Sequence, residues 1–310
     1  MTIKRVLRSL AIRIWNRLPN TWRNSAIGQG FGRLTHRLVS NNASRMHYVG
    51  TYFMRNRPEL ELMRCIVDHA PAQSEVKIAV LGCSKGCEVY SILWVLRTAR
   101  PDLRYNIFAV DISEEVLNFA HCGVYTEDAV DDPPCEASKP CDADRITRRD
   151  QDASIFHRLS GRERDSLFEI SAETVRVKAL FREGITWHCG DANDPKLQGV
   201  LGSSDIVVAN RFLCHMPPSE AEACLRQIVR LVRPGGFLFV TGIDLDVRSK
   251  VALEMGWKPI TKLLKEIHEG DPSLRSGWPL NYWGLEPLRT DRDDWQVRYA
   301  SVFIVNETST

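Results

Sequence analysis

The chain has 310 residues, of which 44% are hydrophobic and 26% charged, and its formal net charge is +2. This composition excludes collagen-like, mucin-like and wholly disordered proteins, and no uncharged apolar run is long enough to predict a transmembrane helix. The nine cysteines form no CxxC pair and no other spacing typical of zinc ligands. We therefore expect no metal site and a reducing, cytoplasmic location.

Positive charge is concentrated at the beginning of the chain. Residues 1–58 contain eleven Lys or Arg and no Asp or Glu, whereas the remainder carries 30 basic and 39 acidic residues. Residues 3–18 have the period of an amphipathic helix, whose apolar face is formed by Ile3, Val6, Leu7, Leu10, Ile14 and Leu18. We interpret 1–58 as a basic helical segment, of which residues 3–18 can lie on an anionic membrane surface, peripheral to the inner face. A helix packed against the following domain and an organellar transit peptide are the alternatives, and no nucleic acid is expected as a partner.

From residue 59 onward, apolar runs of strand length alternate with helical periods. Helices are predicted at 60–69, 90–100, 113–121 and 219–231, and strands at 77–81, 105–110, 184–189, 205–209, 237–241 and 297–305. Ser113 and a Ser219–Glu222 capping box are the expected starts of two of these helices. This alternation predicts an α/β fold, a doubly wound and mostly parallel sheet with helices on both faces. We expect one domain at 59–310, with an insertion at 126–180 and a Trp-rich C-terminal extension at 245–296.

The first strand and the turn that follows it carry the main functional signal. The strand enters the sequence Gly82-Cys-Ser-Lys-Gly86, and Asp111 ends the second strand 29 residues after Gly82. Glycines at such a turn let backbone amides approach a ligand, and an acid at the second strand end suits ribose hydroxyls. These features predict a nucleotide-like cofactor. A nicotinamide enzyme is one alternative, although the turn lacks the third glycine of the dinucleotide motif, and no P-loop is present.

The same region resembles the cofactor site of the chemotaxis-receptor methyltransferases, the CheR family. The matching segments are Thr51 to Arg55, Ser84 to Ser91, Val110-Asp111-Ile112 and Gly123-Val124-Tyr125. The similarity extends over residues 51–245. It implies a class I methyltransferase with a Rossmann-like fold and S-adenosylmethionine as the cofactor.

The resemblance also implies roles for individual residues. Gly82, Ser84 and Gly86 would cradle the methionine part of the cofactor, and Glu88 would bind its polar end. Asp111 would hold the ribose hydroxyls, while Ile112, Asp191 and Ala192 would contact the adenine. Asn210 would face the methionine moiety, and Arg55 would lie near the transferred methyl group or its acceptor.

The residues on the acceptor side differ from the family pattern. Asn210 and Arg211 occur in the reverse order, and His215 stands where the family has a tyrosine. A histidine can act as the base for a hydroxyl acceptor, with Asp244 orienting it, or it can simply close the pocket wall. We therefore expect O-methylation of a hydroxyl or carboxyl acceptor, at a membrane surface. The alternatives are methylation of a chemoreceptor glutamate and a non-catalytic S-adenosylmethionine-binding regulator.

Overall fold

The computed structural model describes residues 3–40, 49–126, 154–171 and 174–306. Its centre is a seven-stranded sheet in the order β6-β2-β1-β7-β8-β10-β9. The strands are β1 (Glu75–Leu81), β2 (Arg104–Asp111), β6 (Ile185–Cys189), β7 (Ser204–Val208), β8 (Val232–Phe239), β9 (Lys258–Pro259) and β10 (Val302–Ile304). The pairs formed among β6, β2, β1, β7 and β8 are parallel, and β10 pairs antiparallel with both β8 and β9. A sheet with an antiparallel strand inserted near one edge differs from the all-parallel dinucleotide-binding sheet.

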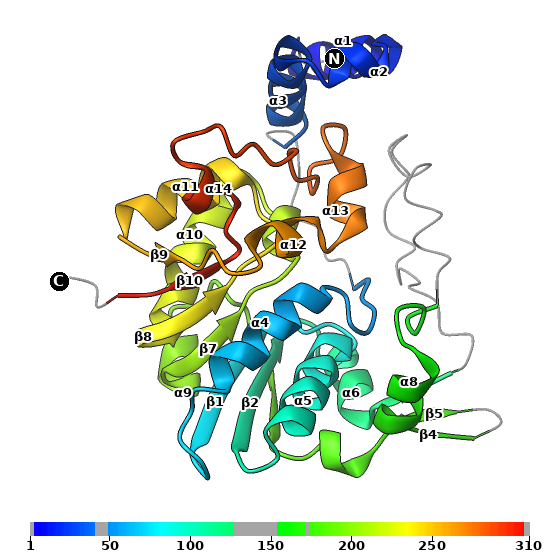
Figure 1. The fold of residues 1–310 in the computed structure, drawn as a ribbon, viewed down its shortest axis with the longest axis vertical. Coiled ribbons are helices and arrows are strands. Elements are labelled where there is room, and N and C mark those ends of the chain that lie inside the picture. The colour runs from blue at the N-terminus through cyan, green and yellow to red at the C-terminus, as the bar shows by residue number, and fades with distance from the viewer. Residues whose placement is uncertain (1–2, 41–48, 127–153, 172–173, 307–310) are drawn as a thin grey trace.

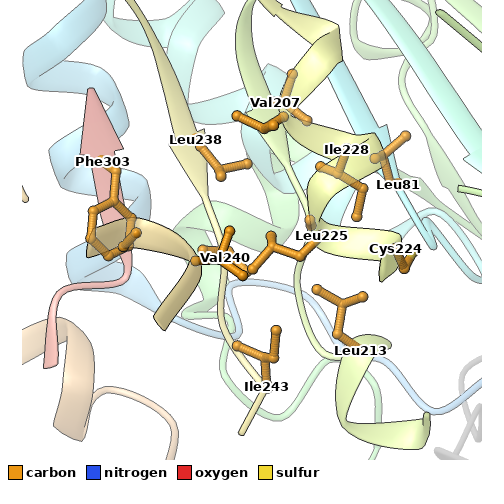
Figure 2. Packing of buried hydrophobic residues seen from close by; sticks show 14 of the residues in the cluster. Leu81, Val207, Leu213, Cys224, Leu225, Ile228, Leu238, Val240, Ile243 and Phe303 are labelled. Carbon is orange, nitrogen blue, oxygen red and sulfur yellow. The ribbon is translucent and has the colours of Figure 1, made fainter. Parts of the chain in front are cut away.

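Helices cover both faces of this sheet (Figure 1). One apolar cluster joins one face to α4 (Arg57–Val67), α5 (Cys87–Ala99), α6 (Glu114–Cys122) and α12 (Leu264–Glu269). The other joins the opposite face to α9 (Leu197–Leu201), α10 (Pro218–Ile228), α11 (Leu245–Glu254), α13 (Pro272–Gly277) and α14 (Trp295–Tyr299). Figure 2 shows part of the second cluster, in which Leu225 and Ile228 of α10 pack near Val207 and Leu238 of the sheet. The predicted doubly wound α/β fold is confirmed.

Alternation along β1 explains why both faces are buried. Ile78 and Val80 belong to one cluster, and Ala79 and Leu81 belong to the other, and all four are fully buried. Successive side chains of a strand point to opposite faces, so a continuous apolar run is needed for a strand covered on both sides.

Several predicted boundaries are wrong, among them that of the strand predicted at 237–241, which spans Val232–Phe239. Helix α10 begins at Pro218 without a side-chain cap, and Glu222 instead forms ion pairs with Arg226 and Lys250. Proline suits the first helical turn because its missing N–H needs no partner there. The predicted strand at 297–305 is shorter, because residues 295–299 form α14 and only Val302–Ile304 is a strand.

The described part of the predicted insertion forms a small antiparallel sheet together with the two residues just before it, in the order β3-β5-β4. Its strands are β3 (Val124–Tyr125), β4 (Phe168–Ile170) and β5 (Val175–Val177), and α8 (Gly161–Leu167) and a 3-10 turn at Ala179–Phe181 flank them. Phe53 packs into this sheet, stacked on Phe156 and edge-on to Tyr125 and Phe168. The segment just before α4 is thereby held against the insertion.

In the part of the chain described before residue 49, the helices are α1 (Ile3–Arg17), α2 (Asn20–Arg23) and α3 (Ala26–Ser40). They form one end of the molecule, next to α13 (Figure 1). Trp15 of α1 is buried and packs edge-to-face on Trp278, with ring centroids 5.3 Å apart. No helix of the described residues is long and apolar enough to cross a membrane.

Candidate cofactor site

The turn between β1 and α5 has a backbone that glycine favours. Gly82 and Gly86 have φ angles of 65° and 84°, and Ser84 between them also has a positive φ. A Cβ on Gly82 would lie 2.8 Å from the ring of Phe212, which follows β7. The backbone N–H of Ser84 donates to Asp111 Oδ2 at 2.9 Å. The turn is therefore fixed between the ends of β1, β2 and β7, where the chain order of the sheet reverses.

Asp111, the last residue of β2, holds the turn from the side of that strand. It is buried, and its second oxygen accepts the N–H of Ser113, which caps α6 as predicted. Ile112 is 47% exposed beside it. The Asp111 carbonyl accepts the N–H of Gly190, so Asp191 and Ala192 follow β6 at the same sheet edge. Ala192 is buried, and Asp191 accepts the N–H of Asn193 within its own turn.

The side chain of Asn210 joins two buried carboxyl groups. Its oxygen accepts the backbone N–H of Thr241 at 3.0 Å, which fixes the orientation of the amide because a backbone N–H can only donate. The amide nitrogen therefore faces the carboxyls, and donates to Glu59 Oε1 at 2.5 Å and to Glu88 Oε1 at 2.8 Å.

The two carboxyl groups are held in an environment that disfavours their negative charge. Burial, and next the neighbouring Glu88, raise the pKa of Glu59 to about 8, against an opposing hydrogen bond from Asn210. Burial also raises the pKa of Glu88, and Asn210, Arg55 and Arg211 oppose that shift. A carboxyl beside another carboxylate in a dry site retains its proton at neutral pH.

Two adjacent cavities meet at these residues. Gly82, Ser84 and Phe212 contribute to the wall of the first, and Glu59, Thr241 and Asp271 contribute to the wall of the second. Four residues line both cavities: Arg55, Glu88, Asn210 and Arg211.

Both arginines are oriented by residues from other parts of the chain. The Arg55 guanidinium lies over the ring of Tyr52, 4.2 Å from its centroid, and donates to the carbonyl of Gly50. Arg211 forms a 2.6 Å ion pair with Asp271, which also accepts a hydrogen bond from the hydroxyl of Tyr52. Arg55 thus lies in the cavity walls that also contain Glu88 and Asn210, and its predicted place near the methyl group or its acceptor stays a prediction.

His215 and Asp244 lie apart from the walls of these two cavities. The Nδ1 atom of His215 is 2.8 Å from the hydroxyl of Tyr282, in the C-terminal extension. Asp244 caps α11 by accepting the N–H of Asp246.

Sequence reasoning missed Glu59, Arg211, Thr241 and Asp271. Glu59 lies in the first turn of α4, where an acid is common for helix stability alone. Arg211 was noted only as part of a reversed pair. No local pattern connects Glu59 with Asn210, because 151 positions separate them.

Comparison with known families supports the interpretation of this site. Residues 50–141 match the family described as CheR methyltransferase, SAM binding domain, and residues 165–240 match the family described as Methyltransferase domain. The chain thus contains a class I S-adenosylmethionine-dependent methyltransferase domain that resembles the CheR family. Its cofactor is S-adenosylmethionine, rather than a nicotinamide.

Individual relatives are distant. The chain is 24% identical over 201 residues to the probable biofilm formation methyltransferase WspC of Pseudomonas aeruginosa. This alignment covers 64% of this chain and 42% of that protein. The chain is 27% identical over 113 residues to phosphoethanolamine N-methyltransferase 1 of Triticum aestivum, covering 34% of this chain and 23% of that protein. The chain therefore spans less than half the length of these curated relatives. Among solved structures, magnesium protoporphyrin IX methyltransferase from Synechocystis aligns at 13% identity and a TM-score of 0.35, over 84% and 88% of the two chains.

The described residues fit this cofactor chemically. The ring of Phe212 lies close to the turn at Gly82, and Asp111 is the last residue of β2. The buried Oε2 atom of Glu59 has no hydrogen-bond partner among the described residues. An unpaired buried oxygen is costly, so this position suits a group that donates a hydrogen bond.

Proposed function

We propose that the protein transfers a methyl group from S-adenosylmethionine to an oxygen atom of a carboxylate acceptor. The observation that carries this proposal is the pair of cavities that share Arg55, Glu88, Asn210 and Arg211. A cofactor cavity that adjoins a second cavity through two guanidinium groups suits the transfer of a group to an anionic acceptor.

Each predicted cofactor contact has a place in this proposal. Asp111 accepts hydrogen bonds from the ribose hydroxyls, and Ile112, Asp191 and Ala192 surround the adenine. The cradle for the methionine part consists of Gly82, Ser84 and Gly86. Glu88 and Asn210 bind the polar end of the methionine.

The main contribution of the protein to methyl transfer is to align the two reacting groups. The bound cofactor supplies a methyl group on a positively charged sulfur, and an acceptor oxygen displaces that sulfur in line. Arg55 and Arg211 would hold an acceptor carboxylate in that line, which lowers the entropic part of the barrier. A carboxylate is already ionised at neutral pH and needs no base, which agrees with His215 not being among the residues that line the two cavities.

The test uses the stability of the product. The protein is incubated with cell fractions and a methyl-labelled cofactor, and the labelled product is treated with mild alkali. A methyl ester of a carboxylate releases volatile methanol, whereas a methyl ether of a hydroxyl keeps its label. Alkali-stable label would favour the hydroxyl acceptor and restore His215 as its base.

The same assay separates the other candidate functions. Labelled chemoreceptor protein would identify the family's own reaction on a glutamate side chain, for which the CheR family match is the supporting observation. Cofactor binding without labelling of any fraction would support the non-catalytic regulator.

We further propose that α1 lies on an anionic membrane surface, at the inner face of a membrane. Val6, Leu7, Leu10 and Ile14, all of the predicted apolar face, are 42–53% exposed, because α1 packs through Ala11 and Trp15 instead. An exposed apolar face in a segment without acids fits a bilayer with anionic headgroups.

A vesicle experiment tests this surface. Wild type is expected to sediment with anionic vesicles and not with neutral ones, less so at high salt. A Leu7→Glu/Leu10→Glu variant should remain in solution. The matched control is Val200→Glu/Leu253→Glu, which changes two exposed aliphatic side chains of α9 and α11. It should bind vesicles as wild type does. Equal binding of the α1 variant would contradict the proposal.

A further inference from the structure

Glu59 is a buried carboxyl group whose second oxygen is unpaired. It is 5% exposed, lies in the first turn of α4 and forms part of the wall of the second cavity. Asn210 donates to its Oε1 atom, and its Oε2 atom has no partner among the described residues. The fixed orientation of the Asn210 amide places the carboxyl of Glu88 at the same nitrogen.

Charged groups face Glu59 from several elements. Glu88 of α5 and Asp271, which precedes α13, disfavour its negative charge, and the guanidinium of Arg248 in α11 favours it. Arg55 and Arg211 act on Glu88. Two carboxyls that share one amide in a buried site hold a proton between them until a cation arrives.

We infer that Glu59 and Glu88 together bind the α-ammonium of the cofactor's methionine end, and that Glu59 releases its proton when they do so. The inference rests on the proposed function, since it assigns one more ligand to the same cofactor. We assign the proton of the free protein to Glu59, because burial and the neighbouring Glu88 raise its pKa to about 8 and its Oε2 atom has no hydrogen-bond partner among the described residues. On binding, the Glu59 proton leaves to water, and the ammonium keeps its own three hydrogens and pairs with two carboxylates.

An ammonium fits better than other groups for a chemical reason. Oε2 of an ionised Glu59 can only accept hydrogen bonds, and an ammonium offers three donors. The neighbouring Arg55 and Arg211 carry donors alone, so they are suited to carboxylates. The ammonium is therefore the part of the cofactor's amino-acid end that suits Glu59 and Glu88, and Arg55 and Arg211 are left for the acceptor carboxylate.

Proton release makes affinity depend on pH in a defined direction. If binding releases a proton, the affinity for S-adenosylhomocysteine rises with pH, by up to about tenfold per pH unit. The rise ends where Glu59 is already ionised in the free protein.

Calorimetric titration of the full chain with S-adenosylhomocysteine, in phosphate and in imidazole buffer at the same near-neutral pH, counts the protons. We expect the binding enthalpy of wild type to differ between the buffers by an amount that corresponds to release of close to one proton. Glu59→Gln, which mimics the protonated acid, should release none, and its affinity should not rise with pH. Glu61→Gln, on the exposed side of the same helix, should behave as wild type does.

A second ligand isolates the ammonium. 5′-Methylthioadenosine lacks the amino-acid end, and should bind wild type without proton release. Wild type that binds S-adenosylhomocysteine without releasing a proton would overturn the inference and leave the cofactor intact, whatever the variants do. Absence of any binding to wild type would overturn the cofactor site itself.

Discussion

The backbone N–H of Ser84 donates to the carboxylate of Asp111 at 2.9 Å, which fixes the turn after β1 to the end of β2. The same carboxylate accepts the N–H of Ser113 at the start of α6. Asp111 therefore has a structural task besides its proposed contact with the ribose. Both tasks place it at the point where two βα units meet.

Asp111→Ala is expected to weaken binding of S-adenosylhomocysteine by ~1.5–3 kcal/mol, because hydrogen bonds to a charged acceptor are lost and the turn loses its tether. Calorimetry measures the affinity, and urea unfolding measures the accompanying loss of stability. Asp205→Ala is the matched control, since Asp205 also accepts a backbone N–H, from Lys77 near the start of β1. An equal loss of affinity in both variants would argue against the ribose contact.

His215→Ala should leave turnover close to wild type if the acceptor is a carboxylate, because no proton has to be removed. Loss of a general base would lower turnover by about 10²–10⁴-fold. The control is Tyr282→Phe, which removes the hydroxyl that His215 contacts and keeps the imidazole. A large loss in His215→Ala alone, with unchanged cofactor affinity, would establish the hydroxyl mechanism.

The part of the site formed by the turn after β1 and the end of β2 could be predicted from sequence, because local rules determine it. A buried strand, a glycine turn and an acid at the next strand end specify Gly82, Gly86 and Asp111 by their spacing, and Ser113 caps its helix as such residues do.

The rest of the site depends on contacts between distant segments. Asn210 follows β7 and Glu59 lies in α4, so their contact depends on how α4 packs against the sheet and not on a local pattern. The strand predicted at 297–305 begins within α14, which spans Trp295–Tyr299. Arg298 and Tyr299 instead bind the carboxylate of Glu286, an interaction that no periodicity reveals.

The stability of the ligand-free protein should fall as pH rises through the range in which Glu59 ionises. The pKa of Glu59 is about 8 in the folded chain, and that of an unfolded glutamate is about 4.3. The folded state therefore binds the Glu59 proton more tightly than the unfolded state does. The contribution of this proton to the free energy of unfolding is complete below about pH 4 and is lost as pH approaches 8. Urea unfolding is measured at a series of pH values. Toward alkaline pH, the free energy of unfolding of Glu59→Gln should rise relative to that of wild type, by on the order of a few kcal/mol. A constant difference between the two proteins would show that Glu59 titrates normally.

Docking of the N-terminal helices should depend on one glycine of α3. A Cβ on Gly32 would lie 2.3 Å from the ring of Trp278 and 3.0 Å from that of Trp15, so Gly32→Leu should separate the two tryptophans. We expect faster tryptic cleavage within the basic segment and altered tryptophan fluorescence. Gly30→Leu is the matched control, because it gains the same helix propensity and its Cβ would meet only the end of Arg33, at 3.9 Å. If both variants resist trypsin as wild type does, contacts other than the Trp15–Trp278 pair hold these helices on the domain.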